Sequence, residues 1–307
     1  MAVLTVLLPS ARLFDSLSPP LCRWLARGER LPNLSGRYQA LRCLFQIPNI
    51  RFPVAALVRS YDAQDANGEL WLRADPVYLR ADLTTVRMLA WGNLNLSSYE
   101  VEELARSLKP VLGDYGLLLE PLKPSRWYLR CAAGTVLPDF SPPEEVIGDD
   151  LSRHFPTGES AKRWQALHNE TQIILHNHPI NTQRLERGQI PANGLWFWGG
   201  GKLPDWVKSR IAWVVSEDPL LCALARCASI SIKEEIEKIS LENCEQDGVI
   251  DLGNKEIPSI PRLLAQINEK VKRQAMDLML IFNTGQRWSY RPIHRWRFWR
   301  KAHVSIV

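Results

Sequence analysis

The amino-acid sequence predicts an α/β fold with a largely parallel sheet flanked by helices. Buried strands and amphipathic helices alternate along most of the chain, as expected where helical crossovers join parallel strands. With 307 residues, of which 46% are hydrophobic, the chain can bury a large core. The alternation is interrupted only between about residues 66 and 160. We therefore expect residues 1–65 and 161–307 to form the α/β core, and residues 66–160 to form an inserted smaller α+β lobe.

The core is expected to begin with a strand and a helix. The apolar run Val3–Leu8 predicts a short buried strand that Pro9 ends. Pro19 and Pro20 suit the first turn of a helix, which is expected to end near Gly28. The apolar residues of this helix share one face, as in a helix that packs on a sheet.

Within the predicted lobe, one helix is clearly marked. Ser97 and Glu100 have the spacing of a capping box, and an apolar stripe follows them. We expect this helix to cover Ser97–Leu108 and to end at Pro110.

The rest of the lobe is expected to hold short extended pieces and loops. The stretch Gly68–Asp82 indicates a turn and two extended pieces on either side of Pro76. Residues 120–158 are rich in proline and glycine, and they predict loops around a single strand, Trp127–Arg130.

The second part of the core repeats the pattern of strand and helix. Apolar residues at helical spacing predict the helices, and short apolar runs predict the strands. The expected helices cover Trp164–Leu175, Asn181–Gly188, the residues after Asp218, and Leu263–Val271; the expected strands cover Leu195–Trp198, Ile211–Val215 and Leu278–Phe282.

The net charge of +5 is concentrated near the end of the chain. Residues 287–301 hold six basic side chains and no acidic one, so the remainder has a net charge of −1. Five aromatic residues lie between these basic side chains. Such a segment fits a nucleic acid, an anionic membrane surface or a partner protein, but it also fits a final strand and helix with its aromatic residues turned inward.

Cysteine use and the start of the chain predict a soluble cytoplasmic protein without a transmembrane segment. The six cysteines form no C-x-x-C pair, and most lie among apolar residues, so we expect reduced thiols in the core. The apolar run at residues 1–8 is too short to span a membrane, and no basic region precedes it.

Several familiar site motifs are absent. There is no G-x-G-x-x-G and no G-x-S-x-G, and Gly199–Lys202 is followed by Leu203, so it is not a Walker A loop. The three glycines could cradle an anion with their backbone N–H groups, or form a tight turn that packs two tryptophans. His176 and His178 end a helix, where a two-residue step directs them apart, so no metal site is predicted.

The densest run of polar and glycine residues extends from His176 to Lys202, HNHPINTQRLERGQIPANGLWFWGGGK. It resembles the archaeal-type, cofactor-independent phosphoglycerate mutases of the alkaline phosphatase superfamily, whose signature is HPxN…R…G…PAN…WxWGxG. Within that superfamily, WLRADPVYLRAD and LWFWGGG are most similar to bacterial RpfE-type regulatory proteins. The resemblance implies an alkaline-phosphatase-like core with an inserted lobe. The matching residues are His178, Pro179, Asn181, Arg184, Gly188, Pro191, Ala192, Asn193, Trp196, Trp198, Gly199 and Gly201.

The sequence departs from this family where metal-dependent chemistry is expected. Enzymes of the superfamily hold two metal ions with clustered Asp and His residues, which neutralise the phosphoryl group and activate the nucleophile. The first metal-binding Asp would follow the first strand, but here Pro9 and Ser10 follow it. No hydroxyl residue lies in Arg51–Leu57, before Tyr61-Asp62, where the nucleophile is expected. After the last strand, Asn283–Trp288 replaces a ligand-rich segment.

The resemblance implies a phosphorylated-metabolite pocket between core and lobe. Its expected members are Arg73, Asp75, His178, Asn181, Arg184, Asn193, Trp198, Gly199, Gly200, Gly201 and Lys202. Arg73 and Arg184 would pair with phosphate or carboxylate oxygens, and His178 would donate a hydrogen bond. A possible ligand is 3-phosphoglycerate.

Three functions stay open at this point. The first is a degenerate mutase-like protein without a metal site or cofactor, acting as a regulatory or metabolite-binding protein. The second is an active mutase, which interconverts 3- and 2-phosphoglycerate with rearranged ligands and requires Mn²⁺ or Zn²⁺. The third is an interaction protein that binds nucleic acid, acidic lipid or a partner through residues 287–301.

Overall fold

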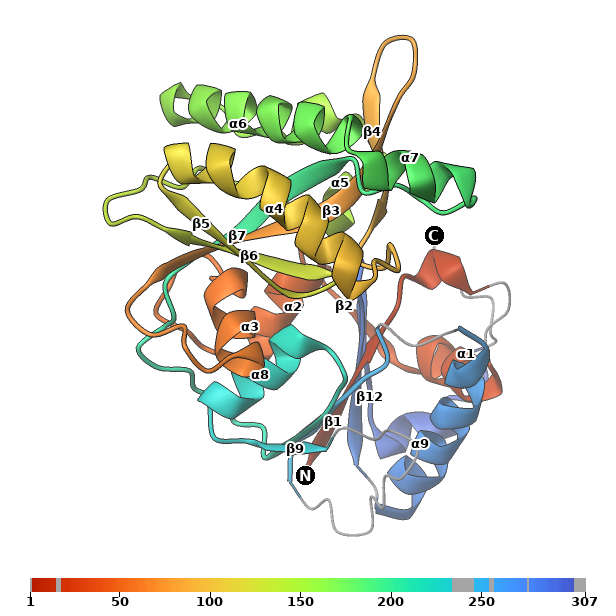
Figure 1. Cartoon of the computed structure of the whole chain (residues 1–307). Coiled ribbons are helices and arrows are strands. Elements are labelled where there is room, and N and C mark those ends of the chain that lie inside the picture. Colours follow the sequence, from red (N-terminus) through yellow and green to blue (C-terminus); the bar gives the residue numbers. More distant parts are fainter. Residues whose placement is uncertain (1, 15–17, 234–245, 254–256, 275, 301–307) are drawn as a thin grey trace. The chain divides into compact units, whose positions relative to one another are not determined.

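The computed structural model describes residues 2–14, 18–233, 246–253, 257–274 and 276–300 (Figure 1). The chain forms two compact units. Unit 1 consists of Met1–Pro48 and Asp205–Val307, and unit 2 of Asn49–Pro204. These boundaries differ from the predicted ones at 65/66 and 160/161, because the segment after residue 160 returns to pair with strands of unit 2.

Unit 1 contains the parallel sheet that the sequence predicts. Its seven strands lie in the order β2-β12-β11-β1-β10-β8-β9, and all neighbours from β11 to β9 are parallel. β12 and β2, at one edge of the sheet, are antiparallel to their neighbours. The strands are β1 (Val3–Leu8), β2 (Glu29–Leu31), β8 (Trp213–Val215), β9 (Ser231–Lys233), β10 (Gly248–Asp251), β11 (Asp277–Phe282) and β12 (Arg287–Tyr290).

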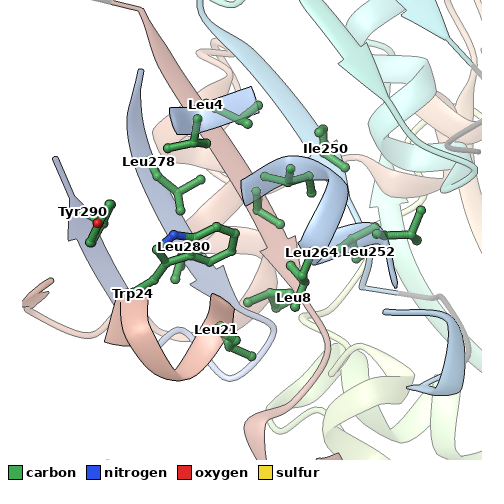
Figure 2. Close-up of a cluster of buried hydrophobic side chains, with 14 of the residues drawn as sticks. Leu4, Leu8, Leu21, Trp24, Ile250, Leu252, Leu264, Leu278, Leu280 and Tyr290 are labelled. Carbon is green, nitrogen blue, oxygen red and sulfur yellow. The ribbon is translucent and has the colours of Figure 1, made fainter. Parts of the chain in front are cut away.

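One face of this sheet is closed by α1 (Pro19–Arg27) and α9 (Ile260–Gln274), which bury their apolar stripes together (Figure 2). Leu21 and Trp24 of α1 are 0% and 1% exposed, as expected for the inward face of the predicted helix. The other helical segments of unit 1 are α2 (Gly36–Leu44), α8 (Pro219–Cys227) and the 3₁₀ turns η1 (Ala11–Leu13), η3 (Ile257–Ser259) and η4 (Pro292–Trp296).

Unit 2 is built on an antiparallel sheet. The long strand β3 (Leu70–Ala81) pairs with β7 (Gly194–Gly201), with β6 (Arg126–Cys131) and with β4 (Val86–Trp91), and β6 pairs in turn with β5 (Leu117–Lys123). Residues 120–158 therefore contain two strands rather than the single predicted one, because β5 and β6 form a hairpin.

Helices pack on the sheet of unit 2. The apolar residues of α4 (Ser98–Asp114) and α6 (Glu159–His176) form one buried cluster with those of the strands. The shorter helices are α3 (Val54–Asp62), α5 (Pro143–Val146), α7 (Pro179–Glu186) and the 3₁₀ turn η2 (Leu151–His154). The capping box predicted at Ser97 and Glu100 is confirmed.

Both predicted breaks at proline residues are wrong. Pro76 lies inside β3, where β6 pairs only as far as Arg73 and β4 begins at Val77. Pro76 is therefore paired with Leu195 of β7 on one edge and lies between two partner strands on the other, where a proline costs less than in a continuous ladder. Pro110 lies inside α4, which continues to Asp114 because its last turn buries Leu112.

The three glycines form part of β7 rather than a turn that could cradle an anion. They pair with β3, and they let the start of α3 lie close to the strand. A Cβ on residue 199 would be 2.9 Å from the Cβ of Val54, and one on residue 201 would be 2.7 Å from the Cβ of Pro53. Gly199 also has a φ of 64°, which favours glycine.

The cysteines are less uniformly buried than the sequence predicts. Cys131 and Cys222 are buried, whereas Cys43 and Cys227 are exposed and Cys22 is intermediate. Cys227 lies at the last position of α8, past the buried part of the helix. The sixth cysteine, at position 244, lies outside the described residues.

Candidate functional site

Polar side chains converge at the carboxyl edge of the parallel sheet of unit 1. Ser216 and Asp218 follow β8, Asp251 ends β10, and Asn283 follows β11. The carboxyl ends of parallel strands meet at one edge of a sheet, and α/β proteins place their binding sites there. A binding site of unit 1 is therefore expected at this edge of the sheet.

Arg37, on the first turn of α2, joins these side chains. Its Nη2 lies 3.0 Å from Oδ2 of Asp218 and 3.3 Å from Oδ2 of Asp251, and its Nη1 donates to Oδ1 of Asn283 at 3.1 Å. The side chain of Asp251 is 2% exposed, and those of Arg37 and Asp218 are 12% and 14% exposed. We call Arg37, Ser216, Asp218, Asp251 and Asn283 the Arg37 cluster.

Hydrogen bonds from the neighbouring residues fix the carboxylate of Asp251. Ser216 Oγ donates to its Oδ2 at 3.0 Å, and the backbone N–H of Gly253 donates to its Oδ1 at 2.9 Å. A Cβ on residue 253 would lie 2.9 Å from Nη1 of Arg37, so the end of the Arg37 side chain lies close against the backbone of Gly253. The cluster is thus a built and largely buried arrangement of charges.

No residue of the Arg37 cluster was predicted from the sequence as a site residue. A signal was available, because Asp251 ends a buried strand and Ser216 and Asp218 directly follow another. Parallel strands in one sheet bring such residues to the same edge. Arg37 carried no such signal, since its helix comes from a distant part of the sequence.

The Arg37 cluster does not suit the metal ions that the family resemblance implies. It offers two carboxylates, and the guanidinium of Arg37 already lies against both. A divalent cation bound there would be repelled by this fixed positive charge. Among the described residues, no group of three or more His, Cys, Asp or Glu side chains is placed to hold a metal ion.

The residues predicted from the signature all belong to unit 2, where Arg73, Asp75 and Trp198 lie together. Asp75 is completely buried and accepts hydrogen bonds from Nε and Nη2 of Arg73, at 3.0 and 2.7 Å. It also accepts from Nε1 of Trp198 at 2.8 Å, Nε1 of Trp91 at 3.2 Å and the backbone N–H of Trp127 at 3.2 Å. Arg73 and Asp75 are therefore satisfied by each other and by the tryptophans.

Asn181 and Arg184 lie apart from that group, on α7. Asn181 donates to the carbonyls of Leu175 and Ala192, at 2.7 and 2.9 Å. Arg184 is 1% exposed, and its Nη1 donates to Oε2 of Glu100 at 2.9 Å. These contacts fasten α7 to its neighbours, and they indicate structural roles for Asn181 and Arg184.

The remaining predicted residues also make structural contacts or lie at the surface. His178 is the N-cap of α7, and its Nδ1 accepts from the backbone N–H of Ile180 at 3.2 Å. Burial lowers the pKa of His178, which favours the neutral ring that this contact requires. Lys202 follows β7 and is exposed. Gly199, Gly200 and Gly201 are the strand residues described above.

Asn193 offers a test of this structural interpretation. Its Oδ1 accepts from the backbone N–H of Leu79 at 2.7 Å, and its Nδ2 donates to the carbonyl of Leu79 at 2.8 Å. We expect Asn193→Ala to lower the free energy of unfolding by about 2 kcal/mol, because it leaves two buried backbone groups unpaired. Urea unfolding measures this effect. The exposed Asn169→Ala in the same unit is the control, and an equal effect of both changes would contradict the interpretation.

A second network, which the sequence did not predict, surrounds Asp62 at the end of α3. Asp62 accepts from Nε of Arg126 at 2.8 Å and from the hydroxyl of Tyr128 at 2.7 Å. Burial raises the pKa of Asp62, but the hydrogen bonds from Arg126 and Tyr128 outweigh it and lower this pKa to about 2. Asp62, the acidic member of the Tyr61-Asp62 pair in the resemblance, is thus ionised and held by neighbouring side chains of unit 2.

His168 makes the stability of unit 2 depend on pH. It is 2% exposed, its Nδ1 is 3.1 Å from the carbonyl of Leu195, and among the described residues its Nε2 has no hydrogen-bond partner. Burial lowers the pKa of His168 to about 4. An unfolded histidine has a pKa near 6.5, so the unfolded chain takes up the proton first as the pH falls. We expect a loss of about 3 kcal/mol between pH 7 and pH 4 from this group.

Urea unfolding at both pH values, with His168→Gln beside the wild type, isolates that contribution. The variant should lack this part of the pH dependence, because its side chain does not titrate. His176→Gln, at the exposed end of the same helix, is the control. A wild-type pH profile in His168→Gln would show that the assignment is wrong.

Two cavities in the described part of the chain are lined by other residues. In unit 1, a cavity of about 590 Å³ lies near the start of β1 and β10 and is lined by Lys208, Arg210 and Asp247, among others. In unit 2, a cavity of about 340 Å³ lies between the β3–β4 turn and α6. Neither is lined by the predicted pocket residues, and neither touches the Arg37 cluster.

Comparison with known proteins gives distant matches. No family model matches the chain. The chain is 28% identical over 171 residues to a probable 2,3-bisphosphoglycerate-independent phosphoglycerate mutase of Geobacter sulfurreducens, covering 54% of this chain and 43% of that protein. It is 30% identical over 146 residues to the 2,3-bisphosphoglycerate-independent phosphoglycerate mutase of Methanosarcina barkeri, and this match covers 45% of this chain and 36% of that protein. The chain thus spans less than half the length of these relatives.

Among solved structures, a cofactor-independent phosphoglycerate mutase from Thermoplasma acidophilum matches with a TM-score of 0.45 and 18% identity, over 95% of this chain and 90% of that one. No helix in the described residues is long and apolar enough to cross a membrane. The chain has a mixed α/β fold and is distantly homologous to the cofactor-independent phosphoglycerate mutases.

Proposed function

We propose that this chain is a degenerate phosphoglycerate-mutase-like protein, which has lost metal-dependent phosphoryl transfer and keeps a regulatory or phosphorylated-metabolite-binding role. The observation that carries the proposal is the Arg37 cluster. Its guanidinium lies between Asp218 and Asp251, at the sheet edge where the resemblance places metal ligands. The positive charge that the carboxylates need is therefore supplied by the chain.

A guanidinium cannot replace the two metal ions in catalysis. Two-metal phosphoryl transfer uses open coordination positions to bind the attacking oxygen and the leaving oxygen at once. The Nη groups of Arg37 are instead engaged by Asp218, Asp251 and Asn283. The carboxylates of Asp218 and Asp251, which could otherwise bind cations, therefore have a structural role as partners of Arg37.

The segment where the nucleophile is expected supports the same proposal. Arg51–Leu57 contains no Ser or Thr, and the structure begins α3 there, with Pro53 as its N-cap. Val54–Val58 are buried, so no side chain of this stretch could take over the attack on a phosphoryl group. The regulatory part of the proposal rests on the similarity to RpfE-type proteins.

A metabolite that used the predicted arginines would have to compete with internal carboxylates. Arg73 already pairs with Asp75 and Arg184 with Glu100, and both arginines are buried. We therefore place any surviving phosphorylated-ligand contacts on exposed cations such as Lys202 rather than on Arg73 or Arg184.

The test measures activity, metal content and ligand binding on the same purified chain. Conversion of 3-phosphoglycerate to 2-phosphoglycerate is assayed with added Mn²⁺ or Zn²⁺, and bound metal is measured by mass spectrometry. We expect no conversion above a protein-free control and less than about one metal ion per chain. Metal-dependent conversion would overturn the proposal in favour of an active mutase.

Thermal unfolding then tests the binding role. At 100 times its dissociation constant, 3-phosphoglycerate should stabilise the chain by about 2.7 kcal/mol, and the shift should not require Mn²⁺. Stabilisation only in the presence of both would again favour the active mutase. If the melting temperature does not change, 3-phosphoglycerate is not the ligand. The activity assay then still decides whether metal-dependent chemistry has been lost.

A further inference from the structure

The basic and aromatic segment near the end of the chain divides into a buried and an exposed part. β12 pairs with β11, and its Trp288 and Tyr290 are 4% and 6% exposed, so the strand belongs to the core of unit 1. The following residues differ. The exposed fractions of Ile293, Trp296, Phe298 and Trp299 are 70%, 61%, 73% and 66%. The predicted inward packing is thus confirmed for β12 only, and Lys301 lies outside the described residues.

These exposed apolar side chains stand on a turn that is fastened to unit 1. Arg27 Nη1 donates to the carbonyl of Arg295 at 2.6 Å, Arg297 Nη2 donates to Oε1 of Glu29 at 2.8 Å, and Arg300 Nη1 donates to the carbonyl of Gly28 at 3.1 Å. The last turn therefore lies beside the end of α1. The contacts hold four large apolar side chains in water, which is unusual for a soluble surface.

Positive charge surrounds the apolar side chains. Arg291, Arg295, Arg297 and Arg300 come from the same segment, and Arg23, Arg27 and Arg30 come from α1 and the start of β2. Arg27 Nη1 donates to the carbonyl of Arg295 at 2.6 Å, and Arg297 Nη1 donates to the carbonyl of Arg27 at 3.2 Å, so the two sets lie close together. Glu29 is the one acidic residue within these two described segments, residues 23–30 and 291–300. We call these arginines and the four apolar residues the basic-aromatic patch.

The arrangement of the aromatic rings distinguishes between two anionic partners that the arginines could bind, a single-stranded nucleic acid and a membrane surface. Single-stranded nucleic acids stack their bases on open aromatic faces. Here the guanidinium of Arg295 lies 5.0 Å from the ring centroid of Trp296, and Phe298 and Trp299 contact each other edge to face, at 5.4 Å and 79°. Ile293 and Phe298 offer no polar atom to a base edge.

The same features match the surface of an anionic bilayer. Tryptophan favours the headgroup level of a membrane, apolar side chains enter the acyl boundary, and arginines pair with lipid phosphates. We propose that the basic-aromatic patch binds the surface of membranes that contain anionic phospholipids. The chain would lie on the bilayer, with Ile293, Trp296, Phe298 and Trp299 inserted and the arginines at the phosphate level.

Vesicle co-sedimentation with the full chain tests this proposal. The probes are vesicles of phosphatidylcholine alone and vesicles of phosphatidylcholine and phosphatidylglycerol at a ratio of about two to one. We expect binding to the mixed vesicles and at least tenfold weaker binding to phosphatidylcholine alone. Raised salt should weaken the binding to the mixed vesicles, because it screens the arginines.

Two pairs of substitutions separate the apolar and the electrostatic contributions. Trp296→Ala with Trp299→Ala should lower the partition coefficient by roughly tenfold or more, since less apolar surface enters the bilayer. Arg23→Gln with Arg295→Gln should lower it roughly 25-fold, at about fivefold for each charge. All four side chains are exposed, so circular dichroism and thermal unfolding should stay as in the wild type.

Matched controls lie on the same unit. Trp206→Ala removes another partly exposed tryptophan with a cation over its ring, Lys208 at 5.0 Å. Arg262→Gln removes an exposed arginine on α9. Both should keep full vesicle binding. Equal loss in the controls and in the patch variants would overturn the proposal.

Two other results would also overturn it. One is tight binding to a single-stranded oligonucleotide without binding to mixed vesicles, which would assign the patch to nucleic acid. The other is concentration-dependent dimerisation that Trp296→Ala with Trp299→Ala abolishes, again without vesicle binding, which would assign it to a second copy of the chain. Either outcome leaves the proposal on mutase chemistry untouched, since it concerns a different part of unit 1.

Discussion

Asp75→Ala is expected to lower the free energy of unfolding by about 4 kcal/mol, because it leaves the buried guanidinium of Arg73 without its counter-charge. Asp75 is 0% and Arg73 4% exposed, so water cannot replace the lost carboxylate without opening the sheet. The change also removes the acceptor for Trp91 and Trp198. Urea unfolding followed by far-ultraviolet circular dichroism measures the loss.

Controls make this result specific to the pair of charges. Asp114→Ala, at the exposed end of α4, should change stability by less than about 0.5 kcal/mol. The double variant Arg73→Met with Asp75→Leu should recover only the part of the loss that comes from the unpaired guanidinium, since apolar residues can replace a buried ion pair but give Trp91 and Trp198 no acceptor. If Asp75→Ala folds poorly, Asp75→Asn serves as a milder change. A loss below 1 kcal/mol in both single variants would show that Arg73 has another counter-charge.

Arg37→Ala is the second substitution with a large expected effect, about 3 kcal/mol of destabilisation. It leaves Asp218 and Asp251 facing each other at the carboxyl edge of the sheet without the guanidinium between them. The matched change Arg226→Ala, in the exposed last turn of α8, should have little effect. Chemical unfolding of the two variants and the wild type provides the comparison.

Arg37→Ala also tests whether the guanidinium takes the place of a cation. With it removed, the oxygens of Asp218, Asp251 and Ser216 would form a site suited to a hard divalent cation. Mn²⁺ should then raise the melting temperature of Arg37→Ala and leave that of the wild type unchanged. If Mn²⁺ stabilises both proteins equally, the guanidinium does not exclude the metal, and the proposed loss of metal chemistry fails.

Much of unit 1 could be predicted from the sequence, because local rules and tertiary packing agree there. The strand Val3–Leu8 and the helix after Pro19 lie as expected, with Leu21 and Trp24 buried. Asp218 caps α8 as its position before a proline indicates. In each case one short stretch of sequence contains the signal and the element it determines.

The errors in unit 2 arise where a distant partner outweighs a local signal. Proline normally interrupts a strand, but β6 pairs with β3 only as far as Arg73 and β4 pairs with it only from Val77. Pro76 is tolerated because it lies between these two partner strands, whose positions are set by the assembled sheet. The glycines after Trp198 indicate a turn locally, yet they extend β7 because Pro53 and Val54 of α3 pack against them. No local pattern contains those partners.

The candidate site shows most clearly which features the sequence determines and which the tertiary structure determines. The sequence by itself determined an α/β chain with a parallel sheet, the resemblance to cofactor-independent phosphoglycerate mutases, and the missing ligand motifs after the first and last strands. Only the tertiary structure decided that Arg73 and Arg184 are held by Asp75 and Glu100, and that Arg37 lies between Asp218 and Asp251. The physical reason is that the sequence determines which side chains carry a charge, whereas the fold determines which of them meet. Asp75 is only two residues from Arg73, but Glu100 is far along the chain from Arg184, and Asp251 is far from Arg37.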